Sequence, residues 1–230
     1  MANKVNIILV HGAWTDGSSW RKVIPILSKE GHTVSATQHP LTSLADDVEI
    51  TRRLAEAQDG ITLLVGHSYG GAVITEAAAK CPNVAGLVYI AAFAPDEEES
   101  LGTLSQRTNP AAGNLAVHPD KYGTLWIDKN KFRESFCQDV AEEEVTVMAT
   151  VQKPIAIQCF TDKVTNAGWK NLPCWYQLSE QDQMIAPETE AYMAERMNPV
   201  KKIALPSSHA SMMSHPEEIA DLILTACKHL

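Results

Sequence analysis

The residues best suited to chemistry lie at positions 66–70, in the order Gly-His-Ser-Tyr-Gly. The apolar residues 61–65 precede them, and an alanine-rich stretch typical of a packed helix follows. Gly66 and Gly70 let a strand and a helix approach each other around a strained serine without Cβ clashes. Such a turn exposes the Ser68 hydroxyl at the positive end of a helix, beside backbone N–H groups. We therefore predict a nucleophile elbow at Ser68.

A serine nucleophile at neutral pH needs a histidine base, and the base needs a carboxylate that fixes its tautomer and stabilises its charged form. His209 follows the last predicted strand, residues 200–205, and Asp182 follows the strand before it, residues 174–178. In a parallel sheet, groups that follow strands gather at the carboxyl ends of those strands. We predict a catalytic triad of Ser68, Asp182 and His209.

Other residues compete for the two supporting roles. His67 adjoins the nucleophile, but neighbouring side chains diverge, and His215 fits better at the start of the last helix. The remaining histidines follow no late strand: His11, His32, His39, His118 and His229. Three other carboxylates stay open as alternatives for the acid: Glu180, Asp162 and Asp96.

An oxyanion hole requires two convergent backbone N–H groups. The residue after the nucleophile, Tyr69, supplies one of them. The loop after the first predicted strand supplies the other, for which Ala13 is the first candidate and Trp14 the second. These are main-chain roles, so proline is the substitution that would exclude either position.

Apolar strands alternate with helical segments over most of the chain, which predicts a mostly parallel sheet of about six strands with helices on both faces. This core comprises residues 1–95 and 172–230. Residues 96–171 interrupt the alternation with acidic helical pieces, dispersed aromatic residues and no clear buried strand, and we expect an inserted, mostly helical cap. The strands are predicted at residues 5–10, 32–36, 61–65, 84–92, 174–178 and 200–205.

Apolar side chains of the cap and of the loops are candidates for lining a substrate pocket, although a cap packed on a sheet needs such residues in any case. The candidates are Trp14, Leu125, Trp126, Phe160 and Met184.

The composition of the chain limits the kinds of molecule that it is expected to bind. The formal net charge is −9 with no cluster of lysine and arginine, which argues against nucleic acid and anionic membranes. The five cysteines show neither disulfide nor metal-ligand spacing, so reduced thiols in the cytoplasm and no metal are expected. The apolar stretch at residues 5–10 is too short for a signal peptide or a membrane span. A homodimer is left open.

The motifs together resemble the α/β-hydrolase superfamily, and more narrowly the small esterase branch related to salicylate-type methylesterases and hydroxynitrile lyases. The resemblance implies a cofactor-free site with Ser68, Asp182 and His209, and with oxyanion donors at Ala13 and Tyr69. The lyases have threonine where Gly12 stands and lysine where Ala210 stands, so cyanohydrin cleavage is disfavoured. The resemblance rests on residues 11–14 (HGAW), 66–71 (GHSYGG), 92–96 (AFAPD), 182–187 (DQMIAP) and 208–216 (SHASMMSHP).

The site and the resemblance predict a serine carboxylic-ester hydrolase that acts on small, largely apolar esters through an acyl-enzyme. Two alternatives remain. The same triad serves lactone hydrolysis, carbon–carbon bond hydrolysis or perhydrolysis, or the chain is a ligand-binding module built on a hydrolase scaffold.

Overall fold

The computed structural model describes residues 4–230 and contains a central sheet of six parallel strands in the order β2-β1-β3-β4-β8-β9. This confirms the predicted sheet. The central strands β1 and β3 are buried along their whole length, as expected for parallel strands covered on both faces. The strand bounds are β1 Asn6–Val10, β2 Thr33–Ala36, β3 Thr62–His67, β4 Val84–Ile90, β8 Cys174–Ser179 and β9 Lys201–Leu205.

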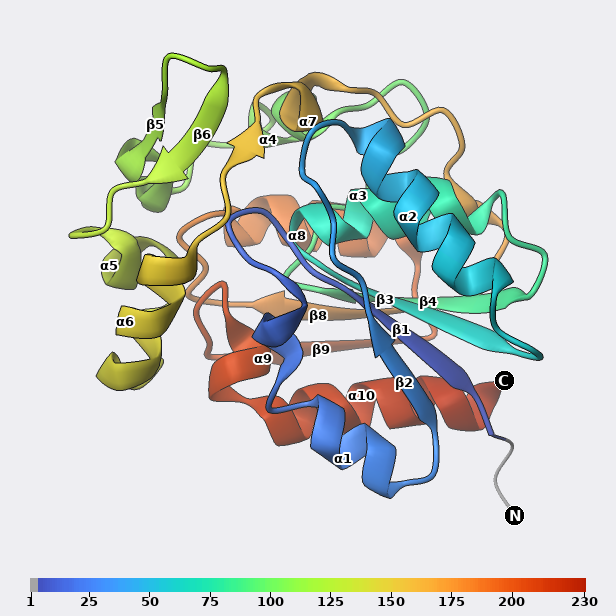
Figure 1. The fold of residues 1–230 in the computed structure, drawn as a ribbon. Coiled ribbons are helices and arrows are strands. Elements are labelled where there is room, and N and C mark those ends of the chain that lie inside the picture. Colours follow the sequence, from blue (N-terminus) through green and yellow to red (C-terminus); the bar gives the residue numbers. More distant parts are fainter. Residues whose placement is uncertain (1–3) are drawn as a thin grey trace.

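Helices cover both faces of this sheet: α1 and α10 lie on one face, and α2, α3 and α8 lie on the other (Figure 1). Each helix follows or precedes a strand, which is the alternation expected for right-handed crossovers. The bounds are α1 Ile24–Lys29, α2 Leu44–Glu56, α3 Tyr69–Ala78, α8 Pro187–Met197, α9 Ser211–Ser214 and α10 Pro216–His229.

The segment between β4 and β8 lies over the carboxyl ends of the central strands (Figure 1). It contains short helices, as expected, but also an antiparallel sheet in the order β5-β6-β7, which the sequence did not reveal. These strands have two to four residues and are mostly half-buried or exposed, so they lack the apolar runs by which strands are recognised. The bounds are α4 Leu101–Ser105, η2 Ala112–Ala116, β5 Val117–Pro119, β6 Thr124–Ile127, α5 Phe132–Phe136, α6 Glu142–Val151, β7 Ile155–Ala156, α7 Gln158–Thr161 and η3 Gly168–Lys170.

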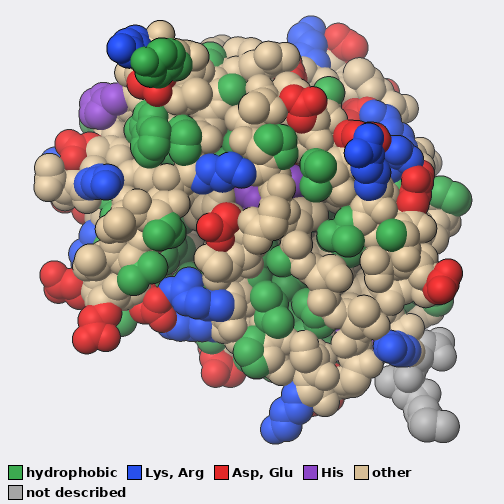
Figure 2. Space-filling model, viewed as in Figure 1, with side chains coloured by type: hydrophobic (Ala, Val, Ile, Leu, Met, Phe, Trp, Pro, Cys, Tyr) green, Lys and Arg blue, Asp and Glu red, His purple; other side chains and the backbone are tan. Residues whose placement is uncertain are grey.

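On the face of the molecule shown in Figure 2, acidic and basic side chains are interspersed. No helix within residues 4–230 combines the length and the apolar character needed to cross a bilayer.

Gly70 is required by the close approach of α3 to β1. A Cβ atom at this position would lie 2.5 Å from the backbone oxygen of Val10. We expect Gly70→Ala to destabilise the fold by about 3 kcal/mol or more, because backbone on both sides must shift. Urea denaturation measures the loss. Gly31→Ala is the control, since nothing lies within 4 Å of its Cβ position and only its φ of +87° opposes alanine. Equal losses in the two variants would contradict the steric explanation.

Candidate active site

Ser68 stands between β3 and α3 with φ 54° and ψ −123°, a backbone conformation that residues other than glycine rarely adopt. Three hydrogen bonds hold it there. Its N–H donates to the oxygen of Ile90 at 3.3 Å, and its carbonyl oxygen accepts from the N–H groups of Gly71 at 3.0 Å and Phe93 at 3.1 Å. The strained serine is thus fixed by hydrogen bonds to β4, to α3 and to the segment that follows β4.

His209 and Asp182 form a buried pair beside this turn. Nδ1 of His209 lies 2.5 Å from Oδ2 of Asp182. The second carboxylate oxygen accepts from the N–H groups of Met184 at 2.6 Å and Ile185 at 2.9 Å. Because the carboxylate orients the ring with the Nδ1 proton facing it, the lone pair of the imidazole is on Nε2. Nε2 is buried and has no hydrogen-bond partner within the described residues.

His67, which directly precedes Ser68, contacts His209 of the His209–Asp182 pair. Its Nε2 donates to the backbone oxygen of His209 at 2.8 Å, and the two ring centroids are 4.8 Å apart. Burial lowers the pKa of His67 well below its usual range, so the ring is neutral. The sequence excluded His67 as the base, and the structure gives it a positioning contact that adjacency to the nucleophile did not indicate.

The three alternative acids lie in other contacts. Asp162 accepts from the N–H of Leu44 at 3.1 Å, Asp96 pairs with Lys170, and Glu180 is exposed. Of the four candidate carboxylates, Asp182 is the one that meets His209.

The two candidate oxyanion donors lie on either side of Ser68. Tyr69 is the first residue of α3, and Ala13 is in the loop after β1. A Cβ atom on the preceding residue, Gly12, would lie 2.7 Å from Cβ of Ser68, so this loop touches the elbow. Neither N–H makes a hydrogen bond to another group between residues 4 and 230. Both are therefore available to an oxyanion.

The side chain of Tyr69 has a separate anchor. Its hydroxyl donates to Oδ2 of Asp47 at 2.7 Å, and Oδ1 of Asp47 accepts from the N–H of Leu41 at 3.0 Å. Burial raises the pKa of Asp47 to about 6. This anchor fixes the first turn of α3, whose N–H groups face the elbow.

Glu190 on α8 is a fully buried carboxyl group beside Asp182. Its Oε2 accepts from the N–H of Ser179 at 3.1 Å, and its Oε1 has no donor among the described residues. Burial and the neighbouring Asp182 carboxylate raise the pKa of Glu190 well above its usual range. Two adjacent buried carboxyl groups disfavour each other's ionisation, so the environment of Glu190 favours its protonated form. The sequence gave no signal for this neighbour.

Glu190→Gln is expected to be more stable than the wild type, by a margin that grows from pH 5 to pH 8. The unfolded carboxyl loses its proton near pH 4.3 whereas the folded one keeps it, so folding stability falls with rising pH by up to about 1.4 kcal/mol per unit. Glutamine removes this dependence, because its amide does not titrate. Urea denaturation at each pH measures the margin. The exposed Glu188→Gln is the control, and a margin that does not change with pH would contradict the protonated state of Glu190.

A small cavity opens beside Ser68. Three of the five predicted pocket residues line it: Trp14, Phe160 and Met184. Leu125 and Trp126 do not. The backbone oxygen of Leu125 accepts from Nε1 of Trp14 at 3.0 Å, and Nε1 of Trp126 donates to Asp120 at 3.2 Å. The sequence missed Phe93, Leu101, Ser105, Asn114 and Ile185, which line the same cavity.

The buried cysteines are unsuited to act as nucleophiles. Burial raises the pKa of four thiols to about 12, so they do not form the reactive thiolate at neutral pH. They are Cys137, Cys159, Cys174 and Cys227. Between residues 4 and 230 there is no group of three or more histidine, cysteine or acidic side chains arranged to hold a metal ion.

Known proteins that resemble this chain in sequence or in structure include several hydrolases. A pyrethroid hydrolase from Sphingobium wenxiniae is 30% identical over 95% of this chain and 86% of its own. Methylesterase 9 of Arabidopsis thaliana is 24% identical over 94% and 96%. A crystal structure of a pyrethroid hydrolase from Sphingobium faniae superposes with a TM-score of 0.86 at 24% identity, covering 97% of this chain and 98% of that one. Residues 7–222 match the model of one family, so the chain belongs to the alpha/beta hydrolase family.

Proposed function

We propose that the chain is a serine carboxylic-ester hydrolase that uses Ser68, His209 and Asp182 and acts on small, largely apolar esters. The observation that carries the proposal is the buried pair in which Asp182 holds Nδ1 of His209 and leaves Nε2 unpartnered. His67, which directly precedes the strained Ser68, is bonded to the backbone of His209. The relatives named as a pyrethroid hydrolase and a methylesterase support an ester as the substrate.

In this mechanism, Nε2 of His209 takes the hydroxyl proton as Oγ of Ser68 attacks the ester carbonyl. The N–H groups of Ala13 and Tyr69 stabilise the oxyanion, and Asp182 stabilises the imidazolium. His209 then protonates the leaving alcohol, which departs and leaves an acyl-enzyme. Water, deprotonated by His209, attacks the acyl carbonyl, and the carboxylic acid is released with Ser68 restored.

The cavity supports uncharged and largely apolar substrates. Phe93, Leu101 and Ile185 contribute apolar surface. Besides Ser68 and Tyr69, the uncharged polar residues Ser105 and Asn114 line it. No charged side chain lines it among the described residues. A carboxylate or ammonium on the substrate would lose its hydration there without a partner.

Cyanohydrin cleavage stays disfavoured. The lyases to which the sequence was compared have threonine at the position of Gly12, and a Cβ atom there would lie 2.7 Å from Cβ of Ser68 and 3.0 Å from Nδ1 of His67. The backbone of this chain leaves no room for that hydroxyl. Lactone hydrolysis, carbon–carbon hydrolysis and perhydrolysis need the same triad, and a substrate panel separates them from ester hydrolysis.

The nucleophile is tested with a fluorophosphonate, which reacts with activated serine hydroxyl groups. Incubation of the wild type with this probe, followed by peptide mass spectrometry, is expected to place the added mass on Ser68, together with loss of p-nitrophenyl butyrate hydrolysis. Labelling at another residue, or full labelling with undiminished hydrolysis, would overturn the assignment.

We also propose that residues 96–171 act as the cap of this enzyme. A cytoplasmic location and a homodimer remain predictions. Cell fractionation tests the location, and analytical sedimentation tests the homodimer.

A further inference from the structure

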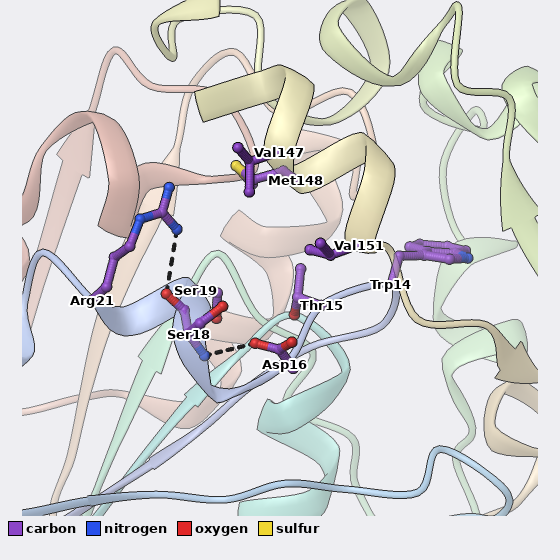
Figure 3. Close-up of a pocket in the computed structure, with 9 residues that line it drawn as sticks. All are labelled: Trp14, Thr15, Asp16, Ser18, Ser19, Arg21, Val147, Met148 and Val151. Carbon is purple, nitrogen blue, oxygen red and sulfur yellow. Dashed lines mark hydrogen bonds between the residues drawn. The ribbon is translucent and has the colours of Figure 1, made fainter. Parts of the chain in front are cut away.

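A small groove lies between α6 and the turn that joins β1 to η1 (Gly17–Trp20). Figure 3 shows its arrangement: Val147, Met148 and Val151 of α6 form one wall, and the turn that carries Ser19 forms the other. Two charged side chains also line the groove, and both have partners: Asp16 accepts from the N–H of Ser18, and Arg21 pairs with Glu144. We call this the α6 groove. It is separate from the triad, and the mechanism above makes no use of it.

The α6 wall is apolar yet exposed. Val147 and Val151 lie one helical turn apart, and their exposed fractions are 53% and 54%. Together with the buried Met148 they line this side of the groove. Exposed apolar side chains gathered on one wall of a concavity are typical of a ligand-binding surface, because burying them against a ligand is favourable.

The opposite wall holds an unsatisfied hydroxyl. Ser19 is 4% exposed, and its Oγ has no hydrogen-bond partner within the described residues. Its neighbours in the turn are already engaged: the hydroxyl of Thr15 donates to the oxygen of Gly12 at 3.1 Å, and Asp16 accepts from the N–H of Ser18 at 2.7 Å. A buried hydroxyl without a partner is costly, and a ligand oxygen in the groove would satisfy it.

Trp14 joins the groove to the reaction site. It lines both the α6 groove and the cavity beside Ser68. It follows Ala13 directly, so its Cα is about 3.8 Å from that of the proposed oxyanion donor. Its φ of 58° is strained, and it is fixed by the hydrogen bond to Leu125 and by ring contact with Phe160 at a centroid distance of 5.8 Å. One lining residue of the groove, Trp14, is therefore the direct neighbour in sequence of Ala13, the proposed donor to the oxyanion formed from the ester carbonyl.

We propose that the α6 groove is an outer substrate subsite, which holds an extended, uncharged apolar chain of the ester beyond Trp14, with an ether or carbonyl oxygen of that chain bonded to Ser19. The inference rests on the proposed esterase function and names the substrate class that it prefers. The apolar chain of the substrate belongs to either the acyl part or the alcohol part of the ester. Esters with a long acyl chain and esters with a long alcohol chain distinguish these two cases.

The test compares Val151→Asp with the wild type on p-nitrophenyl acetate, p-nitrophenyl decanoate and decyl acetate. A charge in the wall should raise KM at least tenfold for one of the two long esters and leave kcat/KM for p-nitrophenyl acetate within twofold. Val200→Asp is the matched control, because Val200 is 52% exposed and lies just before β9, outside the groove. An unchanged KM for both long esters, or an equal rise in the control, overturns the subsite.

Ser19 is tested separately with a p-nitrophenyl decanoate in which one chain methylene is replaced by an ether oxygen. The position of the oxygen is varied along the chain. The wild type is expected to prefer one of these isomers by about fivefold in kcat/KM, the worth of one hydrogen bond, and Ser19→Ala to lose that preference. A preference that persists in Ser19→Ala overturns the contact. If the wild type does not hydrolyse p-nitrophenyl acetate, the esterase proposal itself fails; hydrolysis of acetate without these chain effects rejects only the subsite.

Discussion

Ser68→Ala is expected to lower kcat for p-nitrophenyl acetate by at least about 10⁴-fold, because alanine has no nucleophile and the oxyanion donors alone provide only the residual catalysis. The fold should remain, since Ser68 is held through its backbone N–H and carbonyl oxygen rather than through its hydroxyl. Initial rates of p-nitrophenolate release, with circular dichroism as the check on folding, measure the effect. Turnover that survives in a folded Ser68→Ala would remove Ser68 from the mechanism.

Ser68→Gly provides the matched control. It lacks the hydroxyl as well, but glycine adopts the φ of 54° and ψ of −123° at little cost. We expect it to be as inactive as Ser68→Ala and more stable by about 1 kcal/mol or more. Equal stability of the two variants would show that the turn stores no strain at Ser68.

Asp182→Asn is expected to lower kcat by about 10⁴-fold with little change in KM. The carboxylate accepts a hydrogen bond from Nδ1 of His209, whereas an asparagine that presents its NH₂ group there needs a lone pair on Nδ1. The imidazole proton then moves to Nε2, where it blocks proton transfer from Ser68. Steady-state kinetics at pH 7.5 give the two parameters.

Glu180→Gln and Asp96→Asn are the controls for this prediction, because both residues competed with Asp182 in the sequence. Neither contacts His209, and both should keep kcat within about twofold, as expected for surface charges. A loss in either variant that matched the loss in Asp182→Asn would reassign the acid.

The turn at Ser68 and the places of Asp182 and His209 after two later strands were predictable because local rules determine them. A buried apolar run that ends in Gly-x-Ser-x-Gly before an alanine-rich stretch can turn sharply only where glycines flank the serine, and β3 and α3 meet at Ser68. Strands end where their apolar runs end, so Asp182 and His209 could be assigned to the carboxyl ends of β8 and β9.

The short antiparallel strands between β4 and β8 were not predictable. Their two to four residues are held by pairing with each other rather than by burial of a long apolar face. The residues that line the cavity beside Ser68 were also hard to predict from the sequence. Trp126 and Phe160 are both aromatic residues of this segment, and only the tertiary structure placed Phe160 in the cavity and Trp126 against Asp120.

The amino-acid pattern was enough to predict the sheet, the helices on its two faces, the turn at Ser68 and the candidates for base and acid, because each depends on contacts between residues close in the chain or on strand ends. The contact of Asp182 with His209, the burial of Glu190 beside Asp182, and the place of Trp14 in the lining of both the cavity at Ser68 and the α6 groove became evident only in the folded structure. These last features join residues distant in the chain, and their energies depend on burial and on neighbouring charge, which arise only when the elements pack together.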